Sequence, residues 1–128
     1  MTRRAISTPG APAAVGPYSQ AIATEGFLFT AGQVGLDPAS GAVVEGGVEA
    51  QAERAMANLT AVLDAAGCTW GDVLKTTIFL VDIDDFATVN AVYARFLVDP
   101  SPARSTVAVA ALPKGARVEI ELVARLPR

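Results

Sequence analysis

Segment 117–126, close to the end of the chain, alternates between apolar and mostly charged residues and limits the possible folds strongly. Successive side chains of a β-strand point to opposite faces, so this period of two predicts a strand with one buried face. The apolar face holds Val118, Ile120, Leu122, Ala124 and Leu126. The other face holds Arg117, Glu119, Glu121, Val123 and Arg125. We expect this second face to be either solvated or covered by a partner subunit.

Two segments have the apolar spacing of helices, which would cover the buried face of such a strand. In 48–66, apolar residues recur every three or four positions, and Gly67 supplies the left-handed residue that ends a helix. In 84–97, Asp82 or Asp84 would cap the helix, and Asn90 lies at the margin of the buried stripe. That stripe consists of Phe86, Val89, Tyr93, Phe96 and Leu97.

The remaining pattern predicts strands. Segments 19–24 and 27–31, separated by Glu25-Gly26, are typical of a β-hairpin, whereas 32–47 is expected to be a long loop. Segments 73–81 and 105–110 are further strands. The order is β-β-α-β-α-β-β, which predicts an α+β fold with two helices on one face of a mixed sheet. We expect residues 1–128 to form a single domain.

The composition excludes several kinds of chemistry. The 128 residues include no histidine and one cysteine, so no Ser/His/Asp or Cys/His triad, His-ligated metal or internal disulfide can form. We expect no metal and no cofactor. Catalysis would have to use Arg, Lys, Asp, Glu, Tyr, Ser, Thr or backbone groups. The lack of disulfides fits a reducing compartment, and the prediction is a cytoplasmic protein.

The net charge and the hydropathy limit the kinds of partner that the protein can bind. A net charge of −3 argues against a nucleic-acid-binding protein. No apolar run is long enough for a membrane span, and no apolar region follows the basic start as in a secretory signal. The hydrophobic fraction of 52% is high for a small soluble monomer. Spare apolar surface on a small domain most often lies at a subunit interface.

Three charged residues are candidates for a site. Arg104 follows Pro102-Ala103 at the entrance to a strand, where a guanidinium suits bidentate binding of a carboxylate. Taken alone, it is more often a surface arginine in a weak ion pair. Glu119 and Glu121 share one strand face, so like-charge repulsion would raise one pKa and suit a general acid or base. Alternating charge on a solvated face is the commoner explanation of that pair.

Turns and isolated reactive residues provide weaker signals. Gly16-Pro17 would aim the phenol of Tyr18 in a fixed direction, and Ala31-Gly32 at a strand end would leave backbone groups open to a ligand. Both stretches are also ordinary turn chemistry. Cys68 is expected to be structural, and Lys75 to reach a sheet edge or pair with an acid rather than to form an imine.

Several ordered segments resemble the RidA/YjgF family of reactive-imine deaminases. The resemblance runs from about Ala11 to Ala124, with its motifs in the same order as in the family. They are Ala11-Pro12 through Gly16-Pro17-Tyr18, Ala31-Gly32-Gln33, Asp72–Thr77, Asp85–Asn90, Pro102–Ser105 and Val118–Glu121.

This resemblance implies a chorismate-mutase-like fold and a homotrimer with sites in the clefts between subunits. It implies hydrolysis of 2-imino acids, formed from enamines such as 2-aminoacrylate, to 2-oxo acids and ammonia. By the same resemblance, Arg104 would bind the substrate carboxylate and Glu119 would orient or activate water. The implied substrate-binding residues are Tyr18, Ala31, Gly32, Phe86, Asn90 and Thr106.

Two positions depart from the family's familiar form, and two other functions stay open. Ala31 stands where serine is common, and Thr106 where cysteine is common. The main alternative is a non-catalytic trimeric module that binds small carboxylates or acts in regulation or as a chaperone. A chorismate mutase would share only the fold, and the sequence lacks a basic cluster beyond Arg104.

Overall fold

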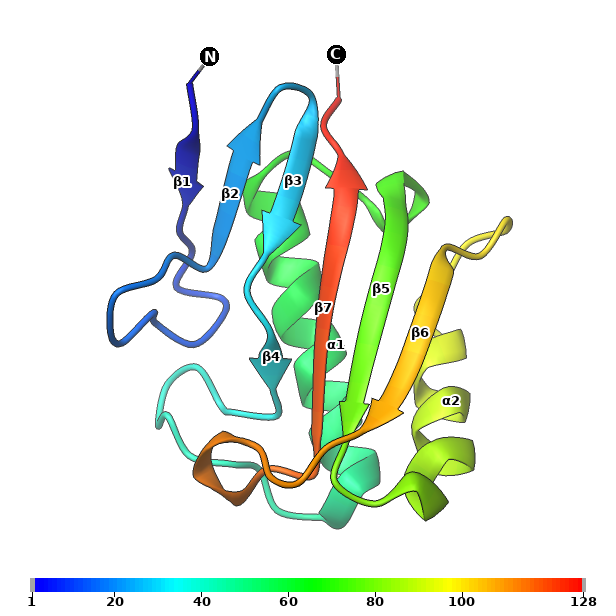
Figure 1. Cartoon of the computed structure of the whole chain (residues 1–128). Helices are drawn as coiled ribbons and strands as arrows, with labels where there is room; N and C mark the ends of the chain where they lie inside the picture. The colour runs from blue at the N-terminus through cyan, green and yellow to red at the C-terminus, as the bar shows by residue number, and fades with distance from the viewer. Residues whose placement is uncertain (1, 128) are drawn as a thin grey trace.

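A computed structural model describes residues 2–127 of the chain as a twisted seven-stranded sheet (Figure 1). The main path of the sheet runs in the order β1-β2-β3-β7-β5-β6, and the short β4 pairs with β7 beyond the end of β3. Among the strand pairs of the described residues, β5 and β6 alone are parallel and the others are antiparallel. The strands are β1 (Arg4–Ile6), β2 (Ala21–Thr24), β3 (Phe27–Thr30), β4 (Gln33–Val34), β5 (Val73–Leu80), β6 (Ala103–Ala108) and β7 (Val118–Arg125).

Both long helices cover one face of this sheet, behind the strands in Figure 1. Helix α1 (Gly47–Ala65) packs on β7 and β4, and α2 (Phe86–Ala94) packs beside it toward β6. The predicted alternation of β7 is confirmed: Val118, Ile120, Leu122 and Ala124 are buried beneath the helices. The α+β fold expected from the two hydrophobic periods is therefore confirmed.

The element bounds differ from the prediction where local patterns are short. The strands β1 and β4, with three and two residues, were missed because a periodic pattern needs a longer segment. Helix α2 is shorter than 84–97: it begins later, because the 3-10 turn η2 (Ile83–Asp85) precedes it and is capped by Asp82, and it ends earlier, at Ala94. Two further 3-10 turns are η1 (Trp70–Asp72) and η3 (Pro113–Gly115).

The helix stripe predicted for 84–97 is only partly correct. Val89 and Tyr93 are buried as expected, and Val92 is buried as well. Phe86 was expected in the core but is 38% exposed. It lies on the first turn of α2, at the sheet edge where β6 has no further neighbour, so little of the core reaches it.

The sheet face opposite the helices, which we call the open face, is uncovered in one protomer. It carries large apolar side chains as well as charged ones, including the exposed residues Phe27, Phe29 and Val107. Strand pairing places Glu119 on this face, directly opposite Phe79 of β5 and Val34 of β4. The face is thus suited to contact another molecule.

None of the helices within residues 2–127 combines the length and the apolarity that a bilayer crossing requires.

Candidate active site

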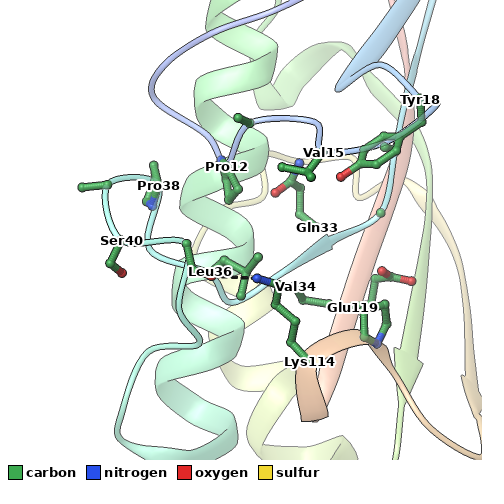
Figure 2. Close-up of a pocket in the computed structure, with 16 residues that line it drawn as sticks. Pro12, Val15, Tyr18, Gln33, Val34, Leu36, Pro38, Ser40, Lys114 and Glu119 are labelled. Atoms are coloured by element: carbon green, nitrogen blue, oxygen red, sulfur yellow. Dashed lines mark hydrogen bonds between the residues drawn. The ribbon is translucent and has the colours of Figure 1, made fainter.

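A pocket of about 740 Å³ opens on the open face next to β4 and β7. Figure 2 shows Tyr18 and Glu119 on one side of it, with Pro38 and Ser40 across from them. Ala31 and Gly32, at the end of β3, also line it. The structure therefore brings together four of the predicted site residues. The volume of the pocket lies in the range of small-molecule sites.

Buried amides fix the loops that form the walls. The Gln20 side chain accepts a hydrogen bond from the Thr8 N–H (2.7 Å) and donates to the carbonyls of Thr8 (3.0 Å) and Pro12 (2.8 Å). On the opposite wall, Asn58 Nδ2 donates to the Leu36 carbonyl at 3.0 Å. Both amides are almost fully buried, so these bonds hold irregular backbone in place where no sheet partner satisfies it.

Glu119 lies half-buried against the backbone of Gly32. A Cβ added at Gly32 would lie 2.6 Å from Glu119 Cδ, so only glycine allows the carboxylate to take this position. Burial raises the pKa of Glu119 above its ordinary value, and the neighbouring Glu121 carboxylate raises it further. Glu121 thus raises the pKa of Glu119 as predicted, although desolvation is the larger cause of the raised pKa.

Arg104 lies in a second cluster on the helix side of the sheet. Its guanidinium carbon lies 5.3 Å from the centre of the Phe86 ring and 5.2 Å from that of Tyr93, and Nη1 donates to Asn90 Oδ1. Aromatic faces and an amide oxygen orient a guanidinium without neutralising it. In addition, Arg104 forms no ion pair within residues 2–127, so its charge is available to an anion.

Thr106 lies two residues further along β6, on the same side of the sheet as Arg104. Its hydroxyl oxygen is buried and is the one buried side-chain oxygen or nitrogen without a hydrogen-bond partner among residues 2–127. With Arg104, Phe86 and Asn90 it lines a small space that is too narrow for a water molecule. These four residues form the second group of predicted site residues.

The two groups lie on opposite faces of the sheet within one protomer. Arg104 is opposite Thr76 in the β5–β6 ladder, and Thr76 is buried and hydrogen-bonded to Tyr93 of α2. Glu119 lies between the core residues Val118 and Ile120 and points the other way. The predicted residues thus form two separate groups rather than one site within a chain.

Lys75 and Cys68, the other reactive residues considered from the sequence, make contacts that fit structural roles. Lys75 Nζ donates to Ser105 Oγ at 3.0 Å at the exposed edge pair β5–β6, where a lysine reaching an edge was expected. Cys68 is buried and burial raises the pKa of its thiol, so the thiolate is disfavoured and a structural role fits. Gln33, the last residue of the Ala31-Gly32-Gln33 motif, also lines the pocket. Lys114 lines it too and was not predicted; the Pro113-Lys114-Gly115 turn was the available signal for it.

These features define a class of small α+β proteins. Such proteins have a small-molecule pocket on the open face of the sheet and an oriented arginine on the helix side of the edge strand β6. The family model described as endoribonuclease L-PSP matches residues 8–126. The chain belongs to this family, the RidA/YjgF family, as the resemblance of its motifs predicted.

Individual relatives match over almost their whole length. The chain is 56% identical to a RutC family protein of Synechocystis, with 99% of both chains covered. It is 50% identical to human 2-iminobutanoate/2-iminopropanoate deaminase, over 97% of this chain and 90% of that protein. Among solved structures, Escherichia coli TdcF with bound serine superimposes with a TM-score of 0.91 at 39% identity, over 97% of this chain and 99% of that one.

Proposed function

We propose that this protein hydrolyses short 2-imino acids, such as 2-iminopropanoate and 2-iminobutanoate, to 2-oxo acids and ammonia. The observation that carries the proposal is a half-buried glutamate of raised pKa in a small-molecule pocket, in a chain 50% identical to the human imine deaminase. An imine is electrophilic enough to be attacked by water once the water is oriented and deprotonated. The reaction thus needs a carboxylate, a cation and a shaped pocket.

Glu119 acts as the general base in this proposal. Its carboxylate accepts a proton from water while the water oxygen forms a bond to the imine carbon, and the C=N electron pair moves to nitrogen, which takes up a proton. The resulting carbinolamine forms the C=O bond as the C–N bond breaks. The carbinolamine nitrogen receives the proton held by Glu119 and leaves as ammonia, while the hydroxyl proton passes to the freed Glu119 carboxylate. Glu119 then releases that proton to solvent, which balances the solvent proton that nitrogen took up in the addition step. A raised pKa suits a group that both takes and returns a proton near neutral pH.

Arg104 binds the substrate carboxylate in two parallel hydrogen bonds. Asn90 and the rings of Phe86 and Tyr93 hold its guanidinium in one orientation, which lowers the cost of ordering it on binding. Tyr18, Ala31 and Gly32 line the part of the pocket next to Glu119, whereas Phe86 forms an apolar wall beside Arg104 and Thr106 lines the same space.

A complete site requires two subunits, because one protomer keeps Arg104 and Glu119 on opposite faces of its sheet. We infer a homotrimer in which the edge strand β6 of one subunit meets the open face of the next. The open face supports this assembly, since Phe27, Phe29 and Val107 leave large apolar side chains exposed on it. A cyclic arrangement of three gives three equal sites with no edge left over.

The test is an imine-decay assay. A lyase or an amino-acid oxidase generates the imino acid in situ, and its disappearance and the release of ammonia are followed with and without the protein. We expect the wild type to accelerate decay and Arg104→Lys to lower kcat/KM about 10- to 100-fold, because lysine keeps the charge but not the bidentate geometry. The matched control is Arg95→Lys, because Arg95 is exposed, forms ion pairs and lies outside both groups of predicted site residues.

The same assay separates the alternative of a non-catalytic module that binds small carboxylates. Such a module binds 2-oxo acids, which calorimetry detects, and leaves imine decay at the rate of the buffer. Equal decay with and without the wild-type protein would overturn the proposed function.

A further inference from the structure

The pocket continues well beyond Glu119. Its lining passes from Tyr18 and Gly32 along Val34 and Leu36 to a far end formed by the loop Pro38–Gly41 and the turn η3. Figure 2 shows Lys114 extending from that turn between Glu119 and the loop that carries Leu36 and Ser40. A short imino acid held at Glu119 fills only part of about 740 Å³, so the rest of the pocket is available to a longer side chain.

Lys114 is held in this position by an unusual backbone. Its φ of 59° and ψ of 23° lie in the left-handed region, which residues other than glycine seldom adopt. A backbone outlier of this kind persists where the surrounding structure determines it, and such outliers gather at ligand sites. Pro113 before it and Gly115 after it form the tight turn, and the buried Ala116 fixes its end.

The ammonium group of Lys114 is available for a ligand. Nζ donates one hydrogen bond, to the Gly41 carbonyl at 3.2 Å, and a lysine ammonium has three donors. The ion pairs of residues 2–127 involve Arg95 and Arg117 and leave Lys114 without a carboxylate partner. Among the lining residues, Lys114 is the one cation and Glu119 the one anion, so the two ends of the pocket differ in charge.

We propose that Lys114 is a specificity-determining residue that binds the terminal carboxylate of longer substrates, so that imino acids with an acidic side chain are among those the pocket takes. This inference rests on the proposed function and names a substrate class for it. The reacting carbon would lie at Glu119, the first carboxylate on the neighbouring subunit's arginine, and the side-chain carboxylate at Lys114. The Gly41 carbonyl keeps the ammonium at the pocket wall before the substrate binds.

The experiment compares two imino acids of equal chain length, made in situ from glutamate and from norvaline by an oxidase. The readout is the ratio of their kcat/KM values with the intact protein. We expect Lys114→Gln to lower the acidic-to-neutral ratio about tenfold, the effect of one charge-assisted contact. Lys114→Arg should keep the ratio within about threefold of wild type, because it retains the charge. Arg95→Gln, on the helix side, is the matched loss of a positive charge.

The outcomes separate this inference from the proposed function. A wild type that hydrolyses the norvaline imine while Lys114→Gln leaves the ratio unchanged overturns the role of Lys114 and leaves the deaminase activity standing. A similar fall of the ratio in Arg95→Gln also overturns it, since the effect would then come from net charge alone. A wild type that hydrolyses neither imine overturns both proposals.

Discussion

Arg104 and Glu119 lie on opposite faces of the same sheet, Arg104 against the rings of α2 and Glu119 on the open face beside Gly32. The strand register fixes this relationship, because β6 pairs with β5 and β5 with β7 without a change of face at these positions. Within a chain the two side chains therefore point to opposite sides of the sheet. The proposed chemistry therefore depends on assembly.

The protein should be a trimer in solution. Sedimentation or light scattering should give about 39 kDa for the wild type, three times the 13.1 kDa of one chain. Val107→Glu places a charge on the apolar open face and should shift the mass toward that of one chain. Val98→Glu is the matched control, since Val98 is 51% exposed and Val107 44%, but Val98 lies after α2. A wild-type monomer would contradict the two-subunit site.

The acid limb of the activity profile should depend on Glu121. The neighbouring carboxylate helps to raise the pKa of Glu119, and a base with a raised pKa loses activity at a higher pH as the solution is acidified. Glu121→Gln should therefore move the acid limb of kcat/KM to lower pH. Desolvation, the larger cause, remains, so the limb should stay above the ordinary glutamate range. An unchanged limb would mean that Glu119 is not the titrating base.

Gly32 should be required for the position of Glu119. Gly32→Ala puts a Cβ 2.6 Å from Glu119 Cδ, so the carboxylate must move. We expect kcat/KM to fall at least about tenfold, the usual cost of a misplaced catalytic group. Gly71→Ala is the control, because its Cβ would meet neighbours only at 3.4 Å and beyond. Full activity in Gly32→Ala would show that catalysis does not require the Glu119 carboxylate in this position.

Two threonines on neighbouring strands should respond in opposite ways to valine. Thr106 has a buried hydroxyl without a partner, so Thr106→Val should stabilise the protein by about 1 kcal/mol. The Thr76 hydroxyl forms a buried 2.7 Å hydrogen bond with the Tyr93 hydroxyl, so Thr76→Val should cost about 1–3 kcal/mol. Thermal or urea unfolding measures both changes. A loss of stability in Thr106→Val would show that its hydroxyl has a partner after all.

The fold could be predicted from the sequence because its longest segments have a clear hydrophobic period. The period of two in 117–126 placed Val118, Ile120 and Leu122 in the core, and the helical spacing of 48–66 gave α1 to within a residue at each end. By contrast, β1 and β4 are held by pairing with distant strands rather than by any local pattern. Local propensity carries no record of such partners.

The candidate site was predictable as a set of residues but not as an arrangement. The ordered motifs identified Tyr18, Glu119 and Arg104, while their division into two groups follows from strand register and from α2, which packs against Arg104 alone of the three. Lys114 was missed because its position depends on a left-handed backbone and on a contact with Gly41, 73 residues away in sequence. A lysine between proline and glycine is otherwise an ordinary turn residue.

Mixing two inactive variants tests the central claim most directly. Arg104→Ala retains Glu119, and Glu119→Gln retains Arg104, so each alone should be inactive in the imine-decay assay. In trimers formed by co-expression of equal amounts, about one quarter of the sites should combine an intact Arg104 with an intact Glu119 from neighbouring subunits. We predict that the mixture recovers about one quarter of wild-type activity. If mixed trimers are verified by native mass spectrometry and stay inactive, Arg104 and Glu119 do not share a site across subunits.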